Sequence, residues 1–136
     1  MSDLFTPEQI EQMTTDLNQQ LLALSKAEPA TFRGDGAARP AAARQRQAIE
    51  QATGQDATTF LARFRHAARQ DLCEADGVLH KQWEKYRDIA SKDMLNRFGV
   101  ILVGLGLTGG VLQTVAVAVA AYVLYLGVKA FCAGEA

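Results

Sequence analysis

Hydrophobic positions are distributed in three different ways along the chain, and each distribution predicts a different helical element. Residues 98–128 form a run without a charged side chain, between Arg97 and Lys129. Crossing the roughly 30 Å hydrocarbon core of a membrane takes about 20 apolar helical residues. The run therefore predicts a transmembrane segment, followed by a short tail over residues 129–136. The aromatic residues placed near its far end as an interfacial belt would be are Tyr122, Tyr125 and Phe131.

Residues 1–26 predict an amphipathic helix. Thr6 is placed as an N-cap, Pro7 as the first helical residue, and Gln9 as the partner of Thr6 in a capping box. Apolar residues then recur at spacings of three and four and make one narrow stripe that needs a partner helix. The members of this stripe are Ile10, Met13, Leu17, Leu21 and Leu24. Residues 27–40 combine prolines and glycines without periodicity and predict a linker.

Residues 41–97 predict a helical stalk. A short helix is expected over residues 41–53 and ended by Gly54, and Asp56 is a favourable N-cap for the next helix. From there apolar residues follow an eleven-residue repeat, which is typical of one long, straight helix. The stripe is expected to be covered by the first helix folding back, by other copies of the chain in an oligomer, or by both. It contains Leu61, Phe64, Leu72, Leu79, Trp83, Tyr86 and Met94. Gly77 weakens the helix, and a break there stays open.

Together these elements predict an all-α protein with a cytoplasmic helical stalk or helical hairpin continuous with a C-terminal transmembrane helix. Basic residues concentrate before the run and Lys129 alone follows it, so the positive-inside rule predicts a cytoplasmic N-terminus and one crossing. A re-entrant or buried hairpin turning at residues 108–110 stays open, although its first leg would be only about 15 Å long. With one crossing, Cys73 and Cys132 lie on opposite sides of the membrane and are expected to be free thiols.

Small and polar residues inside the run predict contacts between copies of the helix. A GxxxG pair continued at spacing four lets membrane helices approach closely, and an amide within the membrane needs a hydrogen-bonding partner. In an oligomer the same amide and the neighbouring threonines are placed to line a narrow pore. The residues expected for helix packing or a pore are Gly106, Thr108, Gly110, Gln113, Thr114 and Ala118. The incidental composition of a membrane helix is the alternative.

The net charge of −1 combines an acidic segment, residues 1–28, with a basic segment, residues 33–46. The candidates for contact with anionic lipid headgroups are Arg33, Arg39, Arg44 and Arg46. Solvated linker charge is the alternative, and no nucleic-acid-binding motif accompanies these arginines. His66, Cys73 and His80 fall along one helical face, but positions seven apart lie about 10.5 Å apart along the axis, too far for one metal ion. The sequence contains no catalytic motif, so we expect no enzyme, no cofactor and no metal site.

These features predict a small homo-oligomeric integral membrane protein that forms a channel or a membrane-perturbing pore through its C-terminal helix. Its expected partners are membrane lipid and further copies of the chain, without nucleic acid. Two alternatives stay open. One is a tail-anchored adaptor whose cytoplasmic helices recruit a protein partner. The other is a pore-forming toxin or defence effector that hides its apolar segment in a helical bundle until it is triggered.

Overall fold

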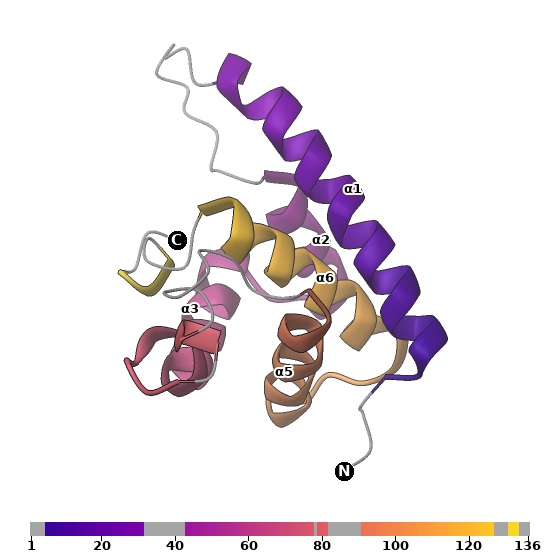
Figure 1. The fold of residues 1–136 in the computed structure, drawn as a ribbon. Helices are drawn as coiled ribbons and strands as arrows, with labels where there is room; N and C mark the ends of the chain where they lie inside the picture. The colour runs from indigo at the N-terminus through magenta and orange to yellow at the C-terminus, as the bar shows by residue number, and fades with distance from the viewer. Residues whose placement is uncertain (1–4, 32–42, 78, 82–90, 127–130, 134–136) are drawn as a thin grey trace.

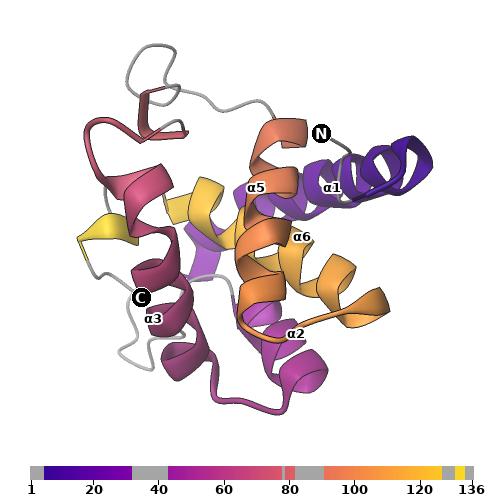
Figure 2. The same cartoon turned by 90° about the horizontal axis from the view of Figure 1, so that it is seen from below.

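The structure consists of helices arranged around one central apolar helix, α6 (Gly109–Leu126) (Figure 1). The computed structural model describes residues 5–31, 43–77, 79–81, 91–126 and 131–133. Within these ranges every regular element is a helix, so the predicted all-α class is confirmed. The helices α1, α2 and α5 all pack against α6, and α3 completes the arrangement by packing against α2 and α5 (Figure 2).

The first helix, α1 (Pro7–Thr31), begins as the sequence predicts. The N–H of Gln9 donates to the Thr6 hydroxyl oxygen at 3.1 Å, and the N–H of Thr6 donates to the Gln9 side-chain oxygen at 2.9 Å, which is a capping box. α1 packs against α6 and α5. Its stripe lies in this contact, with Ile10, Met13, Leu17 and Leu24 buried and Leu21 half-buried.

The end of α1 lies within the predicted linker. The helix continues through Pro29 to Thr31, so the linker predicted from residue 27 begins too early. Alanine and glutamate around Pro29 are strong helix formers, and a proline this near the end of a helix removes one hydrogen bond without preventing the turns before it. The remaining linker residues, 32–40, lie outside the described part of the chain.

The helices α2 (Ala43–Thr53) and α3 (Ala57–Ala68) are short and follow the predicted start and stop signals. α2 ends at the residue before Gly54. At the start of α3, the Asp56 carboxylate accepts a hydrogen bond from the N–H of Thr59 at 3.1 Å, as an N-cap does.

The long helix predicted from the eleven-residue repeat is wrong. After α3 the chain forms a π-helical turn, η1 (Arg69–Cys73), and then reverses direction, and α5 (Ser91–Gly104) is a separate helix. The reversal brings Gly77 against the backbone carbonyl oxygens of Gln70 and Asp71, where a β-carbon would overlap them. Only glycine fits this close approach without a shift of the backbone, so the break that was left open at Gly77 is the one observed.

The apolar residues of the repeat line a core within one chain. Because the chain folds back on itself, they contribute to the same cluster as the stripe of α1 and the buried residues of α6. Leu61, Phe64, Leu72, Leu79 and Met94 are fully buried, whereas Trp83 and Tyr86 lie outside the described residues. The chain itself therefore covers the described part of this stripe, which was one of the alternatives left open beside cover by other copies.

The charge-free run is a helical hairpin. A turn at residues 105–108 separates α5 from α6. The N–H of Leu107 donates to the Leu102 carbonyl at 3.1 Å, which is the long hydrogen bond of a Schellman motif. Gly106 (φ 100°) and Gly109 (φ 63°) have left-handed backbone conformations that residues with a β-carbon rarely adopt. The continuous helix predicted over the run is wrong, and the chain turns close to residues 108–110, where a hairpin had been left open.

A disulfide joins Cys73 at the end of η1 to Cys132 after α6, with 5.6 Å between their Cα atoms. The prediction of two free thiols is therefore wrong. That prediction depended on a single crossing, which would have placed the two residues on opposite sides of a membrane. A hairpin returns the chain to the region where it started, so the two sulfurs can meet.

We expect Gly77→Ala to lower the free energy of unfolding by about 1–3 kcal/mol, because the added methyl group overlaps backbone carbonyls that side-chain rotation cannot relieve. Gly110→Ala is the matched control. Its β-carbon would meet no atom within 4 Å, and alanine favours a helix by about 1 kcal/mol over glycine. Urea unfolding measures both variants, and equal effects would contradict the close approach at Gly77.

Candidate functional site

Among the described residues, α6 is the one helix long and apolar enough to cross a membrane. Ten of its 18 residues are buried inside the molecule. The core helix of a globular protein has the same length and composition, so this property alone assigns no function.

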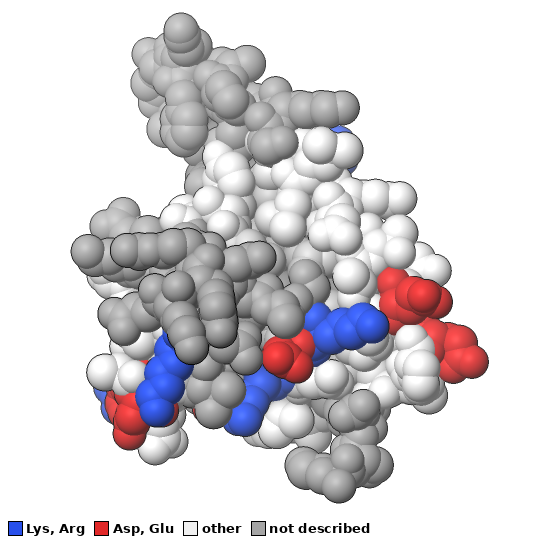
Figure 3. Space-filling model, in the orientation of Figure 1, with Lys and Arg blue, Asp and Glu red and all other residues white. Residues whose placement is uncertain are grey.

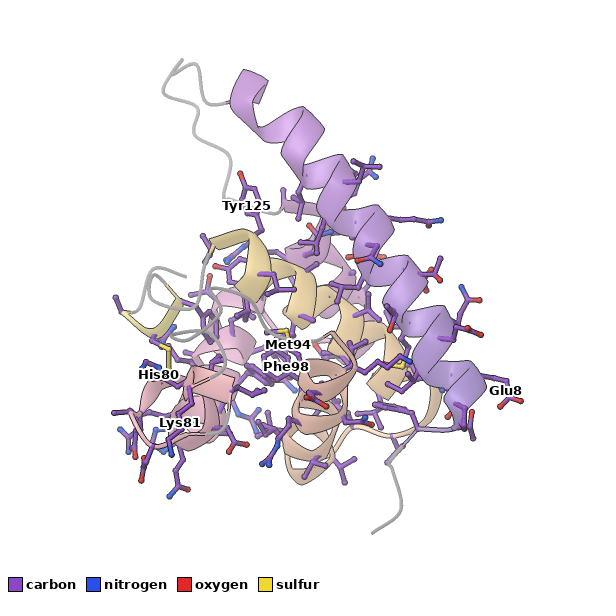
Figure 4. The ribbon with its side chains drawn as sticks, viewed as in Figure 1. Glu8, His80, Lys81, Met94, Phe98 and Tyr125 are labelled. Atoms are coloured by element: carbon purple, nitrogen blue, oxygen red, sulfur yellow. A yellow bond between two sulfur atoms is a disulfide. The ribbon has the colours of Figure 1, made fainter. Side chains whose placement is uncertain are left out.

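The helices around α6 present apolar faces inward and polar faces outward. Figure 4 shows Met94 and Phe98 of α5 directed into the core, and Glu8 of α1 directed away from it. Glu8 and Glu11 on α1 and Arg44 on α2 are exposed. In the view of Figure 3, charged side chains gather over the lower part of the molecule, and uncharged surface covers its middle. α6 is thus enclosed by amphipathic helices that keep it from water.

The turn between α5 and α6, with the helical residues beside it, exposes apolar side chains and no charged side chain. We call residues 100–111 the hairpin tip. Val100, Val103 and Val111 in the tip have exposed fractions of 61%, 43% and 38%. They are three of the four large hydrophobic side chains that the described part of the chain exposes, and the fourth is Leu22 on α1. Exposed apolar side chains concentrated in one place mark a surface that contacts a membrane or a protein partner.

The residues predicted for packing between membrane helices do not form one face. Gly106 lies in the turn and Gly110 lies in α6, so the GxxxG pair is divided between two elements. Of the predicted set, Thr108, Gly110 and Thr114 are exposed, Gln113 is half-buried and Ala118 is buried. In the single chain, α6 is therefore packed through its valines and alanines and not through the predicted small-residue face.

Aromatic rings connect the end of α6 to α3 and α5. Phe64 meets Phe98 edge to face, with 4.8 Å between ring centroids. Phe131 lies 6.3 Å from Phe64 and 6.2 Å from Tyr122, again centroid to centroid. The Arg65 guanidinium is 5.9 Å from the centroid of the Phe131 ring, within the range of a cation–π contact. Tyr122 and Phe131, expected in an interfacial belt, are core residues in this structure.

Two of the four arginines predicted to contact lipid headgroups lie in the described part of the chain. Arg44 is exposed on α2. Arg46 is half-buried, and its guanidinium donates to the Thr58 hydroxyl of α3 and hydrogen-bonds the Tyr122 hydroxyl of α6. Arg46 therefore holds three helices together, which is a structural role. Arg33 and Arg39 lie outside the described residues.

The histidines and the cysteine that share one helical face in the sequence are separated in the fold. Cys73 is bonded to Cys132, and the His80 Nδ1 atom lies 3.0 Å from the Leu72 carbonyl oxygen. His66 is exposed. Within the residues that the structure describes, no group of three or more histidine, cysteine or acidic side chains is placed to hold a metal ion.

Sequence reasoning missed the disulfide, although a signal for it existed. The two cysteines lie on either side of the charge-free run. If the run is a hairpin, both of its ends lie on one side of any membrane and the pairing is allowed. The length expected of a membrane-crossing leg led to the single-crossing interpretation, and that interpretation excluded the bond.

Comparison with known proteins finds no matching family model, no similar curated protein and no similar solved structure. The candidate functional site is the α5–α6 hairpin, with a buried apolar helix, an exposed uncharged tip, and a disulfide that holds the far end.

We expect neither cysteine to react with iodoacetamide in the denatured, unreduced protein, because both sulfur atoms are already bonded. After treatment with a reductant, intact-mass spectrometry should show two added carbamidomethyl groups. Two added groups without the reductant would contradict the disulfide and restore the free thiols that the sequence predicted.

Proposed function

We propose that the protein is a membrane-active helical protein that stores an apolar hairpin inside a folded globule and inserts it into a lipid bilayer on release. One observation carries the proposal: a helix long enough to span a membrane is covered by amphipathic helices of its own chain and is joined to an exposed tip without charge. This is the function of a pore-forming toxin or defence effector that hides its apolar segment until it is triggered.

Transfer of α6 from the core to a bilayer is favourable on physical grounds. Its apolar side chains exchange one apolar environment for another, so their free energy changes little. Its backbone hydrogen bonds stay within the helix, as hydrocarbon requires. With 18 residues at 1.5 Å each, α6 is about 27 Å long, which is close to the roughly 30 Å hydrocarbon core. The unfavourable part of insertion is therefore the exposure to water of the apolar faces that had covered α6.

The helices that cover α6, such as α1, can bind to the membrane surface after α6 leaves. When α6 leaves, the stripe of α1 loses its partner, and exposure of Ile10, Met13 and Leu17 to water opposes release. An amphipathic helix with a narrow apolar stripe and a polar outer face can instead lie at the boundary between headgroups and acyl chains. A membrane thus replaces both the partner that α6 loses and the partner that α1 loses.

The tip is the part of the hairpin best suited to enter first. Charged side chains are expensive in hydrocarbon, and residues 98–128 carry none. Val100, Val103 and Val111 already face the solvent, so they can contact acyl chains before the core opens. The homo-oligomeric pore expected from the sequence is then the inserted state, because single helices must associate to enclose a pore. Because α6 is buried inside the globule, a helix stored until release fits the structure better than a permanent tail anchor.

The double variant Val100→Asp/Val103→Asp should bind vesicles of phosphatidylcholine and phosphatidylglycerol at least about tenfold more weakly than the wild type. An aspartate at the centre of a membrane helix costs about 2.5–3.5 kcal/mol, and a tenfold change corresponds to about 1.4 kcal/mol, so the expectation allows for the shallower position of the tip. Flotation of protein with the vesicles measures binding, and release of an entrapped dye measures permeabilisation.

Leu22→Asp is the matched control for the tip variant. Leu22 is 56% exposed on α1 and lies off the buried stripe, so this substitution adds one negative charge to a comparably exposed side chain outside the hairpin, and the single variant Val100→Asp is compared with it directly. We expect vesicle binding close to that of the wild type. An equal loss of vesicle binding in the control would show that the tip has no special role in binding. If the wild type does not bind vesicles, the proposed function is wrong and α6 is only a core helix.

Weakening the cover should have the opposite effect on permeabilisation. Leu17→Ala removes a fully buried side chain from the contact of α1 with the core, at about 2–5 kcal/mol of unfolding free energy. We expect dye release at lower protein concentration than for the wild type, because less free energy opposes the departure of α6. Asn18→Ala, on the exposed side of α1, should leave dye release unchanged. A destabilised Leu17→Ala with unchanged dye release would contradict storage of α6 by α1.

A further inference from the structure

The Cys73–Cys132 disulfide closes a loop that contains the whole hairpin. Cys73 is the last residue of η1, and Cys132 lies after the end of α6. Beside Cys132, Phe131 is fully buried, with its ring near those of Phe64 and Tyr122. The segment after α6 is thus attached to η1 by a covalent bond and packs through Phe131 against α3.

While this bond is present, α6 can enter a bilayer only with its tip leading. η1 contains Arg69 and Asp71 and stays in water, so the end of α6 that is bonded to it stays at the surface. α5 must then follow the tip inward. Its uncharged part, residues 98–104, is only about 10 Å long, a third of the hydrocarbon thickness. The residues that precede this part include the charged, exposed Lys92, Asp93 and Arg97. The oxidised hairpin therefore reaches only the outer part of the bilayer.

A full crossing has to proceed with the C-terminal end leading. This direction leaves the 18 uncharged residues of α6 in the hydrocarbon and keeps the charges of α5 in water, at the cost of carrying Lys129 and Glu135 across the bilayer. It also carries Cys132 to the far side of the bilayer, about 30 Å from Cys73. The disulfide holds the Cα atoms of these residues 5.6 Å apart. The disulfide and a full crossing of the bilayer by α6 therefore exclude each other.

We propose that the Cys73–Cys132 disulfide is a redox lock that restricts the hairpin to shallow, tip-first contact with a membrane, and that its reduction permits α6 to cross. The inference rests on the membrane-active function proposed above. It assigns the trigger for that function to the redox state of one bond.

The release step is thiol–disulfide exchange with a dithiol reductant. A reductant thiolate attacks one cysteine sulfur, forms a mixed disulfide and displaces the other cysteine as a thiolate. The second reductant thiol, as its thiolate, then attacks the mixed disulfide and displaces the remaining cysteine. The protein gains two electrons and two protons and carries two thiols, and the reductant becomes a cyclic disulfide. Both cysteines are half-buried and not fully enclosed, so a small dithiol has access to the bond.

The test compares the oxidised wild type, the wild type reduced after folding, and Cys73→Ser, in which Cys132 is the only thiol. Each is mixed with vesicles of phosphatidylcholine and phosphatidylglycerol and floated. A membrane-impermeant maleimide then reports whether Cys132 is outside. For the oxidised protein, an impermeant phosphine and the maleimide are added together, so that each thiol is labelled as it is released. Peptide mapping by mass spectrometry assigns the label to Cys73 or to Cys132 in every sample. Circular dichroism before mixing establishes that Cys73→Ser is folded, and the reduced wild type gives an independent reading because it folds with the bond in place.

We expect all three proteins to float with the vesicles. Cys132 of the oxidised protein should be labelled at once. Cys132 of the reduced protein and of Cys73→Ser should be labelled only after detergent opens the vesicles, and their dye release should be at least tenfold greater. Flotation of all three with Cys132 labelled outside in each would overturn the lock and leave the proposed function standing. Absence of flotation in every form would overturn the proposed function itself.

Discussion

The structure depends on the need to cover a helix that is hydrophobic on all sides. Most soluble helices present one apolar stripe, whereas α6 is buried almost around its circumference from Val115 to Val123. One partner helix cannot keep such a helix from water. Three helices, α1, α2 and α5, pack against α6, and most of its buried side chains are valines and alanines small enough to let neighbouring backbones come close. The order of the chain follows from this constraint.

The breaks in the chain are the means by which it encloses its own apolar segment. If α3 continued into α5 as one rod, their apolar stripe would face away from α1 and need other molecules. The reversal at Gly77 and the turn at Gly106 and Gly109 bring α3, α5 and α6 together instead. The aromatic contacts of Phe64 with Phe98 and Phe131 form where these elements meet. Local glycine geometry and core packing therefore specify the same arrangement.

The elements that the sequence predicts well are those whose signals are local. The capping box of Thr6 and Gln9, the N-cap at Asp56 and the end of α2 before Gly54 depend only on neighbouring residues, and all three are observed. The arrangement of the helices is a different problem. A stripe of period near 3.7 has the same spacing whether it faces one long partner or is folded into one core, so periodicity indicates burial and not connectivity. Gly77 indicated the break in the helix, but it is one residue, and the apolar repeat around it is long.

One shared assumption made the hairpin the less favoured alternative and excluded the disulfide. The rule that a leg must be about 30 Å long applies to a segment that is already in a bilayer. It argued against the turn after Gly104, and the single crossing that remained then separated Cys73 from Cys132. In a folded chain α6 is covered by protein, and α5 can be any length. The candidate site differs in kind from the prediction for the same reason: its exposed residues are at the turn, which a continuous helix would not have.

If the helices around α6 have to separate for the proposed function, the folded state cannot be too stable. Single domains are stable by about 5–15 kcal/mol, and in the chain-entropy account a disulfide across a 59-residue separation contributes roughly 4 kcal/mol of this. Loss of the bond therefore lowers stability by a large fraction while every apolar contact of α6 remains. Under the proposed lock, the reduced chain therefore requires a smaller free-energy gain from the bilayer to open. Oxidising surroundings maintain disulfides and the cytosol reduces them, so under the proposed lock the compartment would determine whether the hairpin is held or released.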